Sequence, residues 1–291
     1  MLHNGDVIGL VGCSDARTRD READVVCVER LLLERFGIKT IRSTSIFEDE
    51  DREASARALD LMEMYQNPEI KAIFDISGGD LANEILPYLD FAVIEKAGKP
   101  FVGYSDLTVV LNAIFAKTGV AGWNYQLLHL AGNETELQLR QFENAFVRGE
   151  NAEIPYEIVS ENQDITGTVI GGNIRCLLKL AGTQYLPEPD GEVILLEAMS
   201  GNRNKIATFL AQLDQIGYFE KANGIILGTF TGMEKLGLAE EVPDMVLAYT
   251  QKYDTFLVRT TVVGHYENAK PCPFGSNFND KEWQRCSSQS Q

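Results

Sequence analysis

Short apolar runs alternate with amphipathic segments through the first half of the chain. Runs typical of strands buried on both faces lie at residues 7–12, 38–41, 70–76 and 101–103. Apolar residues recur at helical spacing over residues 22–36, 53–66 and 107–117. Gly37 and Gly119 follow the first and the last of these segments, as expected where helices end. This order predicts a mostly parallel sheet covered by helices on both faces.

The pattern changes after residue 132. Residues 133–164 are polar, charged and poor in strong strands, which predicts a helix followed by a connection between two domains. Further short strands are predicted at residues 168–170, 193–196, 225–227 and 261–263. One amphipathic helix is predicted among them, with apolar positions from Ile206 to Ile216 and an end at Gly217.

The composition is that of a folded protein with an acidic surface. Hydrophobic residues make up 44% of the chain, and 43 acidic against 26 basic residues give a net charge of −17. Such a surface repels phosphate backbones, so nucleic acid is not an expected partner. No apolar run reaches the roughly 18 residues of a membrane helix, and no secretory signal is visible. The five scattered cysteines favour reduced thiols in a cytoplasm.

Common cofactor motifs are missing from the sequence. With three histidines and no paired Cys-x-x-Cys or His-Glu-x-x-His, a protein-ligated metal site is not expected. The Walker phosphate loop is absent, and the glycines of residues 9–12 lack dinucleotide-loop spacing.

Ser105 stands where an apolar strand gives way to a helix. Serine is a preferred helix N-cap, and Asp106 in the first turn suits the helix dipole, so capping alone explains both residues. The other interpretation is a nucleophile beside helix amides that stabilise an oxyanion. The hydrolase elbow Gly-x-Ser-x-Gly is not matched, because Leu107 replaces its second glycine.

A nucleophilic serine requires a base and a group that orients the base. His265 follows the apolar run 260–264, and Glu197 ends the run 193–196. His265 is therefore the candidate base and Glu197 its orienting carboxylate, although a surface histidine and a solvated strand end explain them equally well. His129 lies in an apolar context and is expected to pack in the interior.

Ser77, Gly78 and Gly79 follow the strand predicted at residues 70–76. Glycines at a strand end permit a tight turn, and they also let backbone amides approach a ligand closely. The loop is therefore a candidate oxyanion hole.

Short glycine-rich and polar motifs follow one another along the chain. In the first half these motifs are Ile-Ser-Gly-Gly-Asp at 76–80, Leu-Pro-Tyr-Leu-Asp at 86–90 and Gly-Tyr-Ser-Asp-Leu-Thr at 103–108. In the second half they are Gly-Gly-Asn at 171–173, Ala-Gly-Thr at 181–183, Leu-Leu-Glu at 195–197, Gly-Thr-Phe-Thr at 228–231 and Gly-His at 264–265. In this order they resemble the LD-carboxypeptidase family of serine peptidases, which includes the microcin C self-immunity peptidases. The resemblance covers nearly the whole chain.

The resemblance implies a catalytic triad of Ser105, Glu197 and His265, with an oxyanion hole from the amides of Gly79 and Asp106. It implies a flavodoxin- or amidotransferase-like α/β domain over residues 1–150 that carries the nucleophile. A smaller α+β domain over residues 151–291 would carry the glutamate and the histidine. A homodimer without metal or organic cofactor, with its active site between the domains, is expected.

The implied activity is hydrolysis of an L,D-peptide bond, which releases a C-terminal D-alanine from cytoplasmic muropeptides. Expected substrate contacts are Ser77, Gly78, Asn202 and Arg203, the last two holding the free carboxylate. The chain departs from many family members in three places. Ser77 replaces an arginine, a Gly-Pro pair is missing near residues 123–126, and residues 198–203 lack acidic side chains.

Three other functions remain open at this point. An amidase acting on peptidyl-nucleotide antibiotics would use Trp123 or Tyr125 to stack on the base. A non-catalytic small-molecule binding protein would share the two-lobed fold but need no Ser-His-Glu contact. A cysteine amidotransferase is disfavoured, because no cysteine occupies the strand-to-helix turn.

Overall fold

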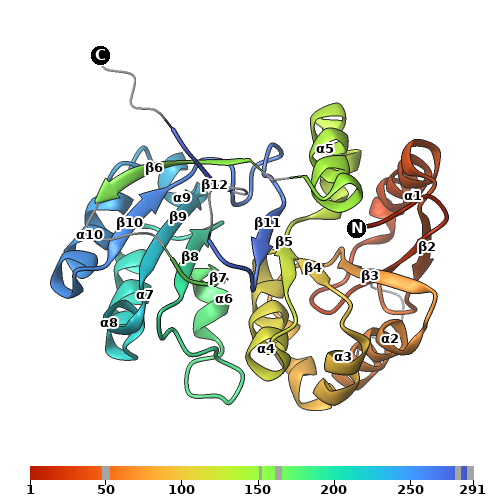
Figure 1. Cartoon of the computed structure of the whole chain (residues 1–291), viewed down its shortest axis with the longest axis horizontal. Coiled ribbons are helices and arrows are strands. Elements are labelled where there is room, and N and C mark those ends of the chain that lie inside the picture. The colour runs from red at the N-terminus through yellow and green to blue at the C-terminus, as the bar shows by residue number, and fades with distance from the viewer. Residues whose placement is uncertain (48–52, 151–152, 161–165, 279–282, 287–291) are drawn as a thin grey trace.

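Two six-stranded sheets lie side by side in the computed structural model, and helices flank both (Figure 1). The structure describes residues 1–47, 53–150, 153–160, 166–278 and 283–286. Apart from one strand, each sheet is built from one half of the chain, and the predicted α/β fold class is confirmed. The predicted boundary after residue 150 falls at residues 151–152, outside the described ranges.

The N-terminal sheet has the strand order β11-β5-β4-β3-β1-β2. Its parallel strands are β1 (Val7–Val11), β2 (Lys39–Arg42), β3 (Ile70–Asp75), β4 (Phe101–Gly103) and β5 (Gly122–Asn124). The order β2-β1-β3-β4-β5 is that of flavodoxin-like folds and reverses between β1 and β3. Such sheets bind ligands beyond the carboxyl ends of the strands at this reversal.

The helices of the first half are α1 (Glu22–Phe36), α2 (Ala54–Gln66), α3 (Phe91–Ala97), α4 (Thr108–Thr118) and α5 (Thr135–Phe142), the last continued by a π-helical turn at Glu143–Arg148. Helices α1, α2 and α4 begin and end close to their predicted residues. Gly37 and Gly119 follow α1 and α4, as expected. The seven residues of α3 are too few to show a helical period in the sequence.

The C-terminal sheet is mixed, with the strand order β12-β6-β10-β9-β8-β7. Its strands are β6 (Ile154–Ser160), β7 (Val169–Asn173), β8 (Val193–Ala198), β9 (Gly224–Phe230), β10 (Phe256–Arg259) and β12 (Trp283–Arg285). Strands β7 to β10 run parallel, and β6 is antiparallel to β10. The helices are α6 (Ile174–Leu178), α7 (Arg203–Gln215), α8 (Tyr218–Lys221), α9 (Thr231–Lys235) and α10 (Glu241–Tyr253). The predicted amphipathic helix is α7, which buries Ile206, Leu210 and Leu213.

Two expectations about strands are wrong. Residues 261–263 form bends, and the strand of this region is β10, which ends at Arg259. The β-branched residues there have high strand propensity, but after Thr260 the backbone leaves the sheet and carries His265 over the end of β9. The segment predicted to be poor in strands contains β6.

Helix α4 joins the two halves. Asn112 on α4 donates to the carbonyl of Gly171 in β7 at 2.8 Å and accepts from its amide at 3.1 Å. The Thr108 hydroxyl accepts from the Asn173 amide at 3.0 Å. Strand β11 (Cys272–Phe274), from the second half, pairs with β5 and completes the first sheet. These buried contacts fix the half that carries Ser105 against the other one.

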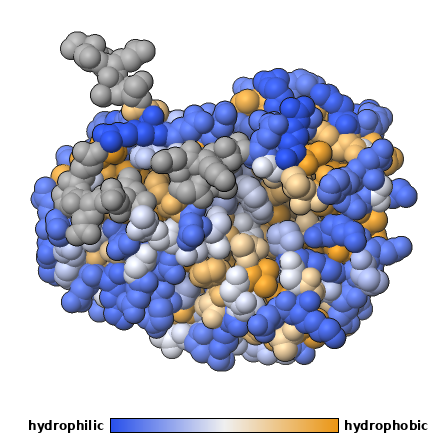
Figure 2. Space-filling view, viewed as in Figure 1, coloured by the Kyte–Doolittle hydropathy of each residue, from blue (hydrophilic) through white to orange (hydrophobic). Residues whose placement is uncertain are grey.

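The viewed face of the molecule is mostly hydrophilic, and paler and apolar residues gather near the middle, where the halves meet (Figure 2). Within the described ranges, no helix combines the length and apolar character needed to cross a membrane.

Candidate active site

Ser105 occupies a strained turn between β4 and α4. Its φ is +58°, a left-handed conformation that is unfavourable for any residue with a side chain. The short 3₁₀ turn Ser105–Leu107 leads into α4, and the N-cap positions of these two helices belong to Tyr104 and Leu107. Ser105 is therefore not the helix cap that its sequence context favours. A strained strand-to-helix turn is how α/β-hydrolases expose a nucleophilic serine.

Glu197 and His265 form a buried pair. The Nδ1 atom of His265 lies 2.7 Å from Oε2 of Glu197, and their side chains are 4% and 1% exposed. The carboxylate favours the tautomer with its proton on Nδ1. Within the described part of the chain, Nε2 of His265 is buried without a hydrogen-bond partner. The imidazole therefore has one oriented nitrogen and one that is available to accept a proton.

The backbone around Glu197 brings this pair together. The register of β8 against β9 shifts between Leu196 and Ala198, so Glu197 lies at a β-bulge, a feature that often re-aims a side chain. Opposite it, a Cβ atom at Gly228 would lie 2.5 Å from the Val263 carbonyl oxygen and 3.1 Å from the Glu197 Cβ. Only glycine lets the chain that precedes His265 approach β9 this closely.

Tyr104 brings the serine turn to the histidine. Its ring centroid lies 4.9 Å from that of His265, and it directly precedes Ser105. The structure therefore places the residue before Ser105 beside the imidazole, whose Nδ1 contacts Glu197. The three predicted triad positions come from β4, β8 and the segment after β10, far apart in the sequence.

Buried hydrogen bonds anchor the glycine loop at residues 77–79, which follows β3. The Ser77 hydroxyl donates to Asp75 at 2.6 Å and accepts from the Ser14 amide at 2.9 Å, and the side chain is 1% exposed. This hydroxyl is thus engaged inside the fold and not presented to a substrate. Burial raises the pKa of the Asp75 carboxyl, although hydrogen bonds from Ser77 and Cys13 oppose the shift.

Only glycine fits at position 79, because of its backbone conformation and its neighbours. Its φ is +137°, and a Cβ atom there would lie 2.2 Å from the Asp15 carboxylate. Gly78 faces open space, since an added Cβ would meet nothing within 4 Å. Arg17, which the sequence did not single out, donates to the carbonyls of Ile76 and Ser77 at 2.5 and 3.2 Å. The loop therefore has a fixed backbone and an open surface.

A pocket of about 270 Å³ lies at the start of α7. It is lined by Arg175, Ser200, Gly201, Asn202, Lys205 and Phe209. Asn202, an expected substrate contact, lines this pocket, and its side chain also caps α7 through the Lys205 amide at 3.0 Å. The structure does not bring Arg203 here, because its Nε donates to Glu241 on α10 at 3.0 Å.

Arg175 and Lys205 are pocket residues that the sequence reasoning missed. Arg175 follows the Gly-Gly-Asn motif, and its Nη2 donates to the Gly79 carbonyl at 3.0 Å. A basic residue shortly after the Gly-Gly-Asn motif was the available sequence indication of Arg175, and Lys205 has no such motif directly before it.

The two aromatic residues considered for base stacking pack against other side chains. Tyr125 is 3% exposed, and its hydroxyl donates to Gln138 at 2.9 Å. Trp123 is partly buried, and its ring packs against Phe146, with centroids 5.1 Å apart. Tyr125 therefore presents no free face of the kind that stacking on a nucleobase requires, and part of the Trp123 ring is occupied by Phe146.

His129 packs beside the active site, as its apolar context predicts. Burial lowers its pKa to about 4. Neutral His129 therefore adds stability above pH 6.5 that is lost as the pH falls toward 4.

Between pH 7 and pH 4.5, protonation of His129 should lower the free energy of unfolding of the wild type by about 2 kcal/mol. Urea unfolding should show this decrease in the wild type and not in His129→Gln. Equal losses in the two proteins would contradict a neutral, buried His129.

A Glu–His pair beside a strained serine turn is typical of hydrolases that use a serine nucleophile. Comparison with known proteins gives the family. The LD-carboxypeptidase N-terminal domain matches residues 8–125, and the LD-carboxypeptidase C-terminal domain matches residues 166–279. The chain therefore belongs to the LD-carboxypeptidase family and is a peptidase, as the motifs predict.

Relatives within this family carry two different names. The murein tetrapeptide carboxypeptidase of Pseudomonas aeruginosa is 26% identical over 75% of each chain. The microcin C7 self-immunity protein MccF of Escherichia coli is 27% identical over 59% of this chain and 60% of its own length. The crystal structure of an MccF-like protein from Bacillus anthracis superposes with a TM-score of 0.81 at 24% identity, covering 95% of this chain and 93% of that one. The last likeness confirms the fold.

Proposed function

We propose that the protein is a serine carboxypeptidase that hydrolyses an L,D-peptide bond and releases a C-terminal D-alanine from muropeptides. The observation that carries the proposal is the buried contact between Glu197 and His265 beside the strained turn of Ser105. The arrangement costs stability through backbone strain and a buried polar pair, and a serine hydrolase uses both groups directly in its chemistry. The name of the Pseudomonas aeruginosa relative supports the substrate class.

The proposed reaction begins when Oγ of Ser105 attacks the scissile carbonyl carbon while Nε2 of His265 takes its proton. The amides of Gly79 and Asp106 stabilise the oxyanion of the tetrahedral intermediate. Cleavage of the C–N bond passes the proton from His265 to the leaving amine and leaves an acyl ester on Ser105. A water molecule then attacks the ester, with His265 again accepting and returning a proton. Glu197 stabilises the imidazolium in both steps.

The free carboxylate of the substrate is assigned to the pocket at the start of α7. Asn202 is retained from the pair expected from the sequence, and Lys205 takes the place of Arg203, because Arg203 is engaged with Glu241. Arg175 also borders the pocket and donates to Gly79. A carboxylate bound there is therefore close to the proposed oxyanion loop, as cleavage of a terminal residue requires.

Lys205→Met is expected to raise KM for a tetrapeptide about tenfold, since a charge-assisted hydrogen bond of about 1.4 kcal/mol is lost. The C-terminal amide of the same peptide should be cleaved poorly by wild type and equally poorly by the variant. Lys252→Met, which removes an exposed partner of Asp214, is the matched control. An equal rise in KM for acid and amide would contradict the assignment.

Turnover of an L,D-tetrapeptide tests the function directly. We expect release of D-alanine from the tetrapeptide, and negligible release of the leaving group from an aminoacyl sulfamoyl adenosine. The second expectation follows from Tyr125, which is 3% exposed, and from Trp123, which is partly buried and packs against Phe146. Faster cleavage of the sulfamoyl adenosine would favour the microcin-immunity amidase, and cleavage of neither substrate would overturn the proposed substrate classes. The cytoplasmic location and the homodimer remain predictions of the family resemblance.

A further inference from the structure

The side chain that follows the proposed nucleophile is a buried carboxylate with a full set of donors. Asp106 is 0% exposed. Its Oδ2 accepts from the Ser14 hydroxyl at 2.6 Å and the Ala82 amide at 2.9 Å. Its Oδ1 accepts from Lys179 at 2.5 Å and from the Cys176 thiol at 3.4 Å. Burial raises the pKa of that thiol to about 12, so it stays protonated and able to donate.

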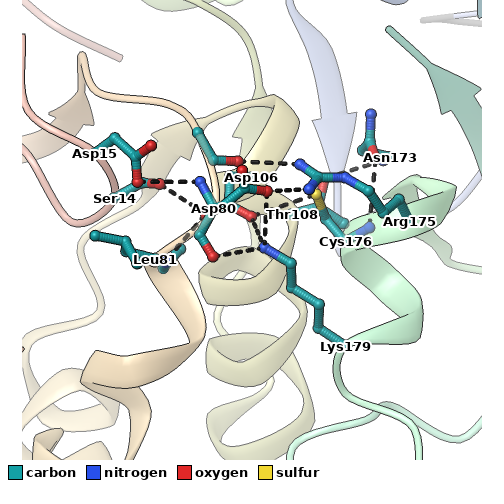
Figure 3. Close-up of polar contacts among 12 residues, drawn as sticks. Ser14, Asp15, Asp80, Leu81, Asp106, Thr108, Asn173, Arg175, Cys176 and Lys179 are labelled. Atoms are coloured by element: carbon teal, nitrogen blue, oxygen red, sulfur yellow. Dashed lines mark hydrogen bonds and ion pairs between the residues drawn. The ribbon is translucent and has the colours of Figure 1, made fainter. Parts of the chain in front are cut away.

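These donors come from three separate parts of the chain. Ser14 follows β1, Ala82 follows the glycine loop, and Cys176 and Lys179 belong to α6 and its C-terminus in the other half. Figure 3 shows the Lys179 side chain reaching from α6 toward both Asp106 and Asp80. Lys179 also donates to the Asp80 carbonyl at 2.8 Å. It is the cation that neutralises the buried Asp106 carboxylate.

The same helix holds the other side of the proposed oxyanion hole. One turn earlier on α6, Arg175 donates to the Gly79 carbonyl and forms an ion pair with Asp80 (Figure 3). Gly79 and Asp106 are the two residues whose amides are assigned to the oxyanion. Both are therefore tethered to α6, and α6 continues directly from β7 in the sheet that carries Glu197.

We propose that Lys179 is a positioning residue. By holding the Asp106 carboxylate, it fixes the position of the oxyanion hole and of the Ser105 turn relative to the Glu–His pair. The proposal rests on the proposed function for the reaction that Lys179 supports. The contacts of Lys179 with Asp106 and Asp80 do not depend on that function. A donor must lie within about 0.5 Å of its productive position to stabilise a transition state, so loss of the tether should slow the chemical step more than binding.

The test uses Lys179→Met together with the double variant Lys179→Met/Asp106→Asn. The single variant leaves an unpaired buried charge that can unfold the protein, and the double variant removes that charge. For each, kcat and KM are measured on the tetrapeptide. The rate constant for phosphonylation of Ser105 by a fluorophosphonate is measured as well, with its endpoint giving the fraction of active protein.

We expect kcat and the phosphonylation rate constant to fall together by about 100-fold in folded variants, with KM within about twofold of wild type. Lys179→Arg, which keeps the charge, should recover most of the rate. A merely structural role would lower the endpoint and the melting temperature but leave the rate constant unchanged. A folded double variant with both rates within twofold of wild type would overturn the proposal. If wild type cleaves no tetrapeptide, the proposed function fails, while the phosphonylation rates still decide the role of Lys179.

Discussion

Ser105→Ala is expected to lower kcat for release of D-alanine by ~10⁶-fold, the scale seen when a serine hydrolase loses its nucleophile. The hydroxyl forms the covalent bond to the acyl group, so no neighbouring group can replace it. KM should change little, because the methyl side chain fills the same turn. The variant keeps the strain of the turn at φ +58°, because alanine retains the Cβ atom.

The matched control is Ser160→Ala in β6, at the far side of the C-terminal sheet from β8. It should retain wild-type activity. Release of D-alanine by Ser105→Ala at more than one-hundredth of the wild-type rate would remove Ser105 from the mechanism. The assay is chromatographic separation of tetrapeptide and tripeptide over hours, which is long enough to detect residual turnover.

Glu197→Gln is expected to lower kcat by ~10⁴-fold while the fold is retained. The glutamine amide can donate to Nδ1 of His265, which moves the imidazole proton to Nε2. That nitrogen then cannot accept the serine proton, and the imidazolium loses its carboxylate partner. The expected effect is large because the two side chains are in contact at 2.7 Å and are nearly inaccessible to solvent.

Glu157→Gln is a suitable control, because it neutralises an exposed carboxylate paired with Arg259 and should not change kcat. The double variant Ser105→Ala/Glu197→Gln should be no slower than Ser105→Ala alone, since triad members act as a unit. A Glu197→Gln enzyme within tenfold of wild type would contradict the role of Glu197.

The sequence predicts most of the N-terminal half, because its strands are buried on both faces and appear as short apolar runs. Helices α1, α2 and α4 are predicted to within one residue at each end. Apolar runs also point to Ser105 and Glu197, since each residue stands just beyond an apolar strand.

Prediction of strands from apolar runs is less successful in the C-terminal half. There, β6 is antiparallel to β10 and partly exposed, and it contains Pro155.

The remaining parts of the site depend on where long side chains turn after the chain has folded. Asn202 and Arg203 are neighbours in the sequence, yet one lines the pocket and the other turns toward α10. Lys179 and Arg175 contact residues about 70 to 100 positions earlier in the chain, and no local pattern encodes that contact. The strain at Ser105 is likewise a property of the folded turn, since serine in this context also suits a helix cap.

The central claim is that Ser105 is a nucleophile activated by a histidine that Glu197 orients. Mass-spectrometric mapping of a fluorophosphonate adduct tests this claim most directly. The account predicts one adduct, on the peptide that contains Ser105, and loss of labelling in both Ser105→Ala and His265→Ala. An adduct on a different residue, or labelling of His265→Ala at the wild-type rate, would contradict it.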